Sequence, residues 1–167
     1  TPKTGEKLPE MQPGQFVQIA IDGSKSTFLR RPISINFVDY NNNQLWLLVR
    51  RAGEGTAHLL NVRSGDSLNI ILPLGSSFTI PTEKSSHLLL VGGGVGIAPM
   101  LYLGYNLKNK GYNPEFLIGA RSAKDILELD ELKSVGTVHI STEDGSLGEK
   151  GLVTTNSIQI GRASCRE

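Results

Sequence analysis

The residues with the clearest chemical meaning are the four glycines of Gly92–Gly96, whose sequence is GGGVG. They follow an apolar run at His87–Val91 and precede a segment of helical periodicity, which predicts the order strand, glycine loop, helix. Glycines let backbone N–H groups approach a diphosphate, and the start of the following helix favours negative charge. The loop therefore indicates a dinucleotide site; the alternative is a tight strand-to-helix turn that binds nothing.

The loop departs from two stricter phosphate-binding patterns. Ile97 interrupts G-x-G-x-x-G, and the Lys-Ser/Thr pair of a P-loop is absent, so phosphoryl transfer is unsupported. Arg121 follows the next expected strand, where an acidic residue would suit an adenosine 2′-OH and an arginine a 2′-phosphate. The choice between NAD and NADP stays open on these residues.

Two further segments place arginine beside small or hydroxyl residues. Arg31 and Ser34 begin an expected strand, where Arg offers a planar fork to a phosphate and Ser a hydroxyl to a ring nitrogen. Arg50–Thr56 repeats the combination next to a possible helix start that Thr56 could cap. Each segment alone is typical of a solvated surface, but two of them in one domain favour an anion site.

The elements that would position these residues change character near Pro81. Before it, short apolar runs separated by Gly, Asn and Asp turns predict an antiparallel barrel or sandwich. The expected strands are Phe16–Ile21, Ile33–Val38, Leu45–Val49 and Leu68–Leu72. Thr56–Leu60 reads either as one helical turn or as a short helix.

After residue 86 the pattern alternates between strand and helix, which predicts a parallel sheet. Further strands are expected at Glu115–Gly119 and Thr137–Ser141, and a second helix at Ala123–Leu132. In the first helix an apolar face is expected, made of Ala98, Leu101, Tyr102 and Tyr105.

Composition excludes several other functions. Of 167 residues, Lys and Arg number 17 and Asp and Glu 16, so a formal charge of +1 gives no electrostatic case for nucleic acid or an anionic membrane. No apolar run or signal pattern indicates a membrane or secreted protein, and we expect a cytoplasmic one. The single cysteine excludes an internal disulfide or a thiolate metal cage, and His58 and His139 are expected to be structural.

Both ends of the chain look like interruptions. The first expected strand follows a Pro13-Gly14 turn, so an earlier partner strand is expected to be missing. Residues 160–167 are similar to a translated sequencing adapter, which would leave Cys165 without a chemical role; the alternative is a native exposed tail.

Five motifs in order and spacing carry a resemblance that covers nearly the whole chain. They are RPIS at 31–34, GEGT at 53–56, PLG at 73–75, GGGVGIAP at 92–99 and EDG at 143–145. Together they resemble the ferredoxin reductase superfamily, and within it most closely the electron-transfer subunits of dihydroorotate dehydrogenase B. The resemblance implies an antiparallel Greek-key FAD-binding β barrel over residues 1–82 and an incomplete NAD-binding α/β parallel-sheet domain over 83–159.

The resemblance also implies roles for individual residues. Arg31 would pair with the FAD diphosphate, Pro32 and Ile33 would line the flavin, and Ser34 would lie near flavin N5. The other implied FAD contacts are Leu48, Val49 and Arg50 along the ribityl-diphosphate or adenosine part, and Gly55 and Thr56 at the diphosphate. The implied floor for NAD is Gly93, Gly94 and Gly96.

The implied function is electron transfer in pyrimidine biosynthesis. Electrons from dihydroorotate would arrive from a separate FMN-containing catalytic subunit, in a heterotetramer, through a [2Fe-2S] cluster, reduce FAD and leave as hydride to NAD⁺. The four cluster cysteines are absent here, so the cluster belongs to a longer parent protein. Alternatives are another NAD(P)H-linked flavoprotein with a ferredoxin, hydrogenase or sulfide-oxidising partner, and a non-catalytic nucleotide-binding module.

Overall fold

The computed structural model describes residues 1–3, 5–23, 27–83 and 87–158. Residues 160–167, expected to be an adapter-derived tail, lie outside them. The chain forms two compact units. The first comprises the described residues of Thr1–Ile80 together with Ala98–Asn106, and the second those of Pro81–Ile97 and Leu107–Glu167. The functional division expected at residue 82 remains a prediction.

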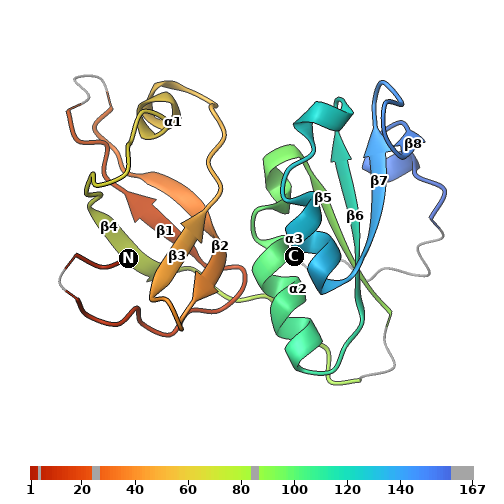
Figure 1. The fold of residues 1–167 in the computed structure, drawn as a ribbon, viewed down its shortest axis with the longest axis horizontal. Helices are drawn as coiled ribbons and strands as arrows, with labels where there is room; N and C mark the ends of the chain where they lie inside the picture. Colours follow the sequence, from red (N-terminus) through yellow and green to blue (C-terminus); the bar gives the residue numbers. More distant parts are fainter. Residues whose placement is uncertain (4, 24–26, 84–86, 159–167) are drawn as a thin grey trace. The chain divides into compact units, whose positions relative to one another are not determined.

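The first unit is built on a four-stranded antiparallel sheet, coloured red to yellow in Figure 1. Its elements are β1 (Phe16–Ile19), β2 (Arg31–Asp39), β3 (Gln44–Leu47), α1 (Glu54–Leu59) and β4 (Ile70–Leu74). The strand order is β3-β2-β1-β4, so the last strand returns to lie beside the first. This is the Greek-key order.

The core of this unit follows the alternation of its strands. Val17 and Ile19 of β1 are fully buried, as is Ile35 of β2. Met11, from the segment before β1, and Tyr102, from helix α2 (Met100–Asn109), complete the same cluster. Residues distant in sequence therefore join the sheet, which is why Ala98–Asn106 belong to this unit.

The second unit carries a parallel sheet of order β5-β6-β7-β8. Its elements are β5 (Leu88–Gly93), η1 (Gly94–Ile97), β6 (Pro114–Ala120), η2 (Ala123–Asp125), α3 (Leu129–Val135), β7 (Thr137–Thr142), β8 (Glu149–Lys150) and η3 (Val153–Thr155). Helix α2 spans Met100–Asn109, and its residues from Leu107 onward also belong to this unit. Phe116, Leu117 and Ile118 of the central strand β6 are buried, as expected for a strand covered on both faces.

One sequence-based expectation about the helices was wrong. The single helix expected at Ala123–Leu132 is a 3-10 turn followed by α3, because Glu128 adopts a left-handed φ of 54° between them. Of the residues expected on the apolar helix face, Ala98, Leu101 and Tyr102 are buried, whereas Tyr105 is 42% exposed. The edge strand β8 had no sequence signal, since two residues are too few to show a period.

The expected fold class is confirmed: an antiparallel Greek-key unit is followed by a parallel α/β unit. Within the described residues, no helix combines the length and apolar character needed to cross a bilayer.

Candidate functional site

The start of β2 carries the first group of predicted site residues. Arg31, Ile33 and Ser34 are partly buried and Pro32 is exposed. The register pairs Arg31 with Ile19 and Ser34 with Phe16 of β1, so the segment is fixed on both sides of the proline. Ile33 also packs against the core of the first unit.

Arg31 lies directly against Gly55, although 24 positions separate them in the sequence. A Cβ added at Gly55 would lie 2.5 Å from Arg31 Nε and 3.2 Å from Arg31 Cδ. The absence of a side chain at Gly55 is what leaves room for the arginine. The structure therefore joins two residues that the sequence predicted separately.

The Arg31 Nε atom is buried and has no hydrogen-bond partner among the residues that the structure describes. A buried donor without a partner is costly, and a charged donor more so. An anion that accepted this hydrogen bond would remove that cost. Arg31 and Gly55 thus form a donor and a cradle that fit a phosphate group.

The neighbouring Arg30 differs from Arg31 in its hydrogen bonds. Its Nη1 donates to the Asn69 carbonyl at 2.9 Å and more weakly to the Gln18 carbonyl at 3.4 Å, and its Nη2 donates to Asn69 Oδ1 at 2.8 Å. Arg30 therefore ties together the chain around β1 and β4. Of the adjacent arginines, Arg31 alone has an unpartnered buried Nε.

Thr56 holds the loop that presents Gly55. Its hydroxyl oxygen accepts hydrogen bonds from the N–H groups of Ala52 at 2.8 Å and Gly53 at 3.0 Å, and its proton goes to the Gly53 carbonyl at 3.0 Å. Because that proton is already used, Thr56 acts here by shaping the loop.

Leu48, Val49 and Arg50 follow directly after β3. Leu48 and Val49 are partly buried, Val49 packs against the hydrophobic core, and Arg50 is exposed. These residues lie on the chain between β3 and the loop at Gly53. Their predicted contacts with FAD stay predictions.

The glycine loop begins in β5 and continues into the 3-10 turn η1. Gly92 is buried, and an added Cβ would lie 2.9 Å from Ile97 Cγ2, so Ile97 packs where a side chain would otherwise be. In contrast, a Cβ at Gly93 or Gly96 would meet no atom within 4 Å among the residues that the structure describes, its direct chain neighbours aside. Gly94 has a left-handed φ of 54°.

Asn36 is a polar residue that sequence reasoning missed. It is 2% exposed, and its Nδ2 donates to the Ala98 carbonyl at 2.9 Å. Its one sequence signal is an amide between the apolar Ile35 and Phe37 of a strand, a position that requires buried hydrogen-bond partners.

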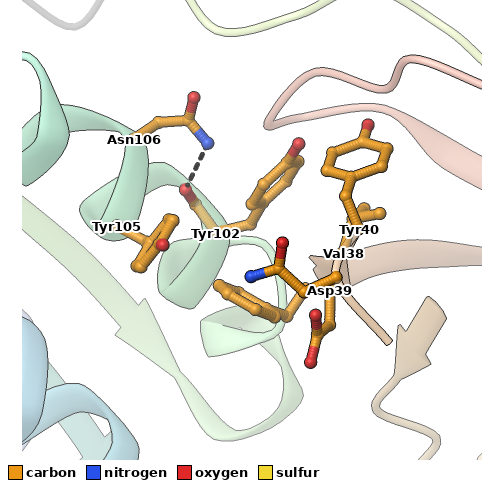
Figure 2. Close-up of a pocket in the computed structure, with 8 residues that line it drawn as sticks. Val38, Asp39, Tyr40, Tyr102, Tyr105 and Asn106 are labelled. Atoms are coloured by element: carbon orange, nitrogen blue, oxygen red, sulfur yellow. Dashed lines mark hydrogen bonds between the residues drawn. The ribbon is translucent and has the colours of Figure 1, made fainter. Parts of the chain in front are cut away.

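A pocket of about 320 Å³ lies in the first unit between the end of β2 and the start of α2. Figure 2 shows its lining: aromatic rings of Tyr40, Tyr102 and Tyr105, with Asn106 donating to the Tyr102 carbonyl at 3.1 Å. Burial raises the pKa of the Tyr102 hydroxyl above its ordinary value. No predicted cofactor residue lines this pocket.

His139 lies on β7, where its Nε2 is 2.8 Å from Glu115 Oε2 on the neighbouring strand β6. That contact agrees with the structural role expected for it. Among the described residues no three His, Cys, Asp or Glu side chains are grouped to hold a metal ion.

Comparison with known proteins gives a consistent result. No family model matches the chain. The "Dihydroorotate dehydrogenase B (NAD(+)), electron transfer subunit" of Listeria monocytogenes serotype 4b is 42% identical over 154 residues, which are 90% of this chain and 59% of that protein. The chain is a homologue of these electron-transfer subunits. It spans about 59% of their length, and the expected family resemblance is confirmed.

Solved structures agree on the fold. An NADH-dependent reduced ferredoxin-NADP oxidoreductase, described in connection with flavin-based electron bifurcation, has a TM-score of 0.76 and 31% identity, with 87% of this chain and 51% of that one covered. The FAD/NAD-binding domain of a Vibrio cholerae nitric oxide dioxygenase has a TM-score of 0.79 at 22% identity, with 95% and 73% covered. The second likeness shows the fold alone.

Proposed function

We propose that this chain is the flavin- and nicotinamide-binding part of an NAD-linked electron-transfer subunit. The observation that carries the proposal is the buried, unpartnered Nε of Arg31 against Gly55. The open backbone at Gly93 and Gly96 supports a second nucleotide site. Homology to subunits named for electron transfer with NAD⁺ supports the same reading.

Arg31 would hold the FAD diphosphate through a charge-assisted hydrogen bond from Nε. The Thr56 hydroxyl keeps Gly55 in place through its bonds to Ala52 and Gly53, so the space beside Gly55 stays available to the Arg31 side chain. Pro32 and Ile33 would line the flavin and Ser34 would lie beside it. When bound, FAD supplies the conversion between one-electron and two-electron transfer.

The glycine loop would bind NAD through its backbone. Side chains are missing at Gly93 and Gly96, so a dinucleotide could lie close to the main chain without displacing protein atoms. Hydride transfer needs the nicotinamide stacked on the flavin with reacting atoms about 3 to 3.5 Å apart. The chain's task is therefore to bind and orient, and we assign no side chain as an acid or base.

The finer proposal concerns the electron source. We infer from the relatives' names that electrons come from dihydroorotate through a dihydroorotate dehydrogenase partner. We further propose, as the motif resemblance implies, that this partner is a separate FMN-containing subunit in the cytoplasm. The [2Fe-2S] cluster implied by the resemblance does not fit this chain, because one cysteine cannot supply four thiolate ligands. Any such cluster would need ligands from outside this sequence, and we derive no step through it.

A second candidate is an NADH-linked reductase with a ferredoxin partner. The 31% identity to an NADH-dependent reduced ferredoxin-NADP oxidoreductase favours it. Both candidates use the same two nucleotide sites and differ in the protein that exchanges electrons with the flavin.

The test is a binding series in which FAD, FMN and riboflavin are titrated into the protein. We expect FAD to bind with the highest affinity, because FMN carries one phosphate and riboflavin none, while Arg31 and Gly55 are placed for a diphosphate. Equal affinity for riboflavin and FAD would contradict the proposal. Reduction of the bound flavin by dihydroorotate only when a dihydroorotate dehydrogenase subunit is present would then separate the two candidates.

A further inference from the structure

The chain segment between the glycine loop and helix α2 is fastened to the sheet of the first unit by a buried amide. Asn36 Nδ2 donates to the carbonyl oxygen of Ala98 at 2.9 Å. Asn36 is 2% and Ala98 3% exposed, so water does not compete for this hydrogen bond. Ala98 is two residues beyond Gly96.

The remaining contacts of this segment are further along the helix. The Tyr102 hydroxyl donates to the Met11 carbonyl at 2.8 Å, and the Phe37 ring meets those of Tyr102 and Tyr105 edge-on, with centroids 5.8 and 5.0 Å apart. Figure 2 shows Tyr102 and Tyr105 projecting from the same stretch of α2. These contacts hold the body of the helix.

The Asn36 contact differs from the ring contacts in its directionality. Edge-on aromatic pairs tolerate variation in distance and angle, whereas an N–H to carbonyl bond weakens steeply outside a narrow geometry. Loss of the donor would also leave the buried Ala98 carbonyl without this partner, which is unfavourable. The backbone at Ala98 is therefore set by Asn36 more sharply than by packing.

We propose that Asn36 is a positioning residue for hydride transfer, which acts by fixing the backbone at Ala98, just after the glycine loop. Strand β2 carries both Asn36 and the residues assigned to the flavin, Arg31 to Ser34. The inference rests on the proposed function. Asn36 would not touch either nucleotide, and its effect would come through the Ala98 backbone.

The experiment compares Asn36→Leu with Tyr102→Phe in the full-length FAD-loaded protein. Both variants remove a buried side-chain hydrogen bond to a backbone carbonyl of the first unit, but only Asn36→Leu releases the loop exit. We expect Asn36→Leu to slow flavin reduction by NADH about 10- to 100-fold, because small misplacements of reacting atoms have effects of that size. Tyr102→Phe should stay within about twofold at a similar loss of Tm.

Three further readouts separate positioning from a merely structural role. FAD affinity should stay within about twofold in both variants, and dithionite should reduce the flavin equally well. Amide hydrogen exchange of residues 92–98 should accelerate in Asn36→Leu and not in Tyr102→Phe. An Asn36→Asp variant should recover the NADH rate as the pH falls, because a protonated carboxyl group can again donate to the carbonyl.

Equal slowing in Asn36→Leu and Tyr102→Phe, or unchanged exchange of residues 92–98, would overturn the role of Asn36. Failure of NADH to reduce the flavin of the unaltered protein would instead contradict the proposed function. The two failures are therefore distinguishable in one set of samples.

Discussion

Glycine serves opposite purposes in the two units. At Gly55 the missing side chain is filled by the protein itself, since Arg31 Nε occupies the space 2.5 Å from where a Cβ would be. At Gly93 and Gly96 a Cβ would meet no atom of the described residues within 4 Å, apart from the glycine's own chain neighbours. One glycine accommodates an arginine, and the other two leave bare backbone.

This contrast indicates two ways to recognise a phosphate. In the first unit a charged side chain is held in place by close packing, and its buried Nε would provide the affinity. In the second unit the main chain itself would contact the ligand. Substitutions should therefore affect the two sites through different routes, which makes the comparison testable.

The largest effect is expected from Arg31→Ala. Loss of a charge-assisted hydrogen bond of about 1.5 to 3 kcal/mol should weaken FAD binding about 10- to 100-fold, as measured by fluorescence titration. Arg30→Ala is the matched control, because Arg30 is engaged with Asn69 and Gln18. It should lower Tm and leave FAD affinity unchanged; equal loss of affinity in both variants would refute the assignment of Arg31.

Gly55→Ala should have the next largest effect. The new methyl group would displace the flexible Arg31 side chain, so FAD affinity should fall about tenfold or less, with a smaller change in stability. In an Arg31→Ala background the same substitution should add almost nothing to the loss of affinity. Independent, additive losses would show that the contact between these residues does not position the arginine.

Gly93→Ala and Gly96→Ala test the proposed NAD site at the glycine loop of the second unit. Neither methyl group would meet an atom of a described residue beyond its chain neighbours, so Tm should stay unchanged while NAD⁺ affinity falls about three- to tenfold in calorimetric titration. Gly92→Ala is the control, since its Cβ would crowd Ile97 and Tm should fall. Unaltered NAD⁺ affinity in both Gly93→Ala and Gly96→Ala would contradict the assignment of the glycine loop to NAD binding.

The smallest effect is expected at the loop after β7, where the carboxylate of Asp144 accepts hydrogen bonds from Ser146. The hydroxyl and then the N–H of Ser146 donate to Asp144 Oδ1, at 2.6 and 2.9 Å, and lower the pKa of Asp144. Because the pKa is lower in the folded state, the Ser146 contacts stabilise the folded protein at pH values above the ordinary Asp pKa of about 3.9. This stabilisation is lost as the pH falls through the lower pKa of the folded state.

Asp144→Asn should therefore lower Tm slightly at pH 7, and the difference from the unaltered protein should shrink as the pH falls below about 4. Glu143→Gln changes the same charge in the same loop and corrects for general charge effects. A Tm difference between Asp144→Asn and this control that did not depend on pH would contradict the role of the Ser146 contacts.

The sequence predicts most of the fold but less of the site. Strands with clear apolar periods appear within two or three residues of their expected places. The break at Glu128 was not predictable, because a left-handed glutamate depends on packing around it rather than on its own preference. Contacts between segments that are distant in the sequence could not be predicted from it either.

Among site residues, the motifs indicate which side chains matter but not how they meet. Nothing in the spacing of Arg31 and Gly55 shows that one packs on the other, or that Arg30 points elsewhere. Asn36 carries no motif at all, and its importance comes only from its burial and its partner Ala98. Sequence patterns report local chemistry, whereas these contacts are made by tertiary structure.

The most direct measurement is anaerobic mixing of the FAD-loaded full-length protein with NADH in a stopped-flow spectrophotometer. The account predicts that the visible absorption of oxidised flavin disappears in a single turnover. Protein that binds FAD and NADH but keeps its oxidised flavin spectrum would contradict electron transfer between the two sites.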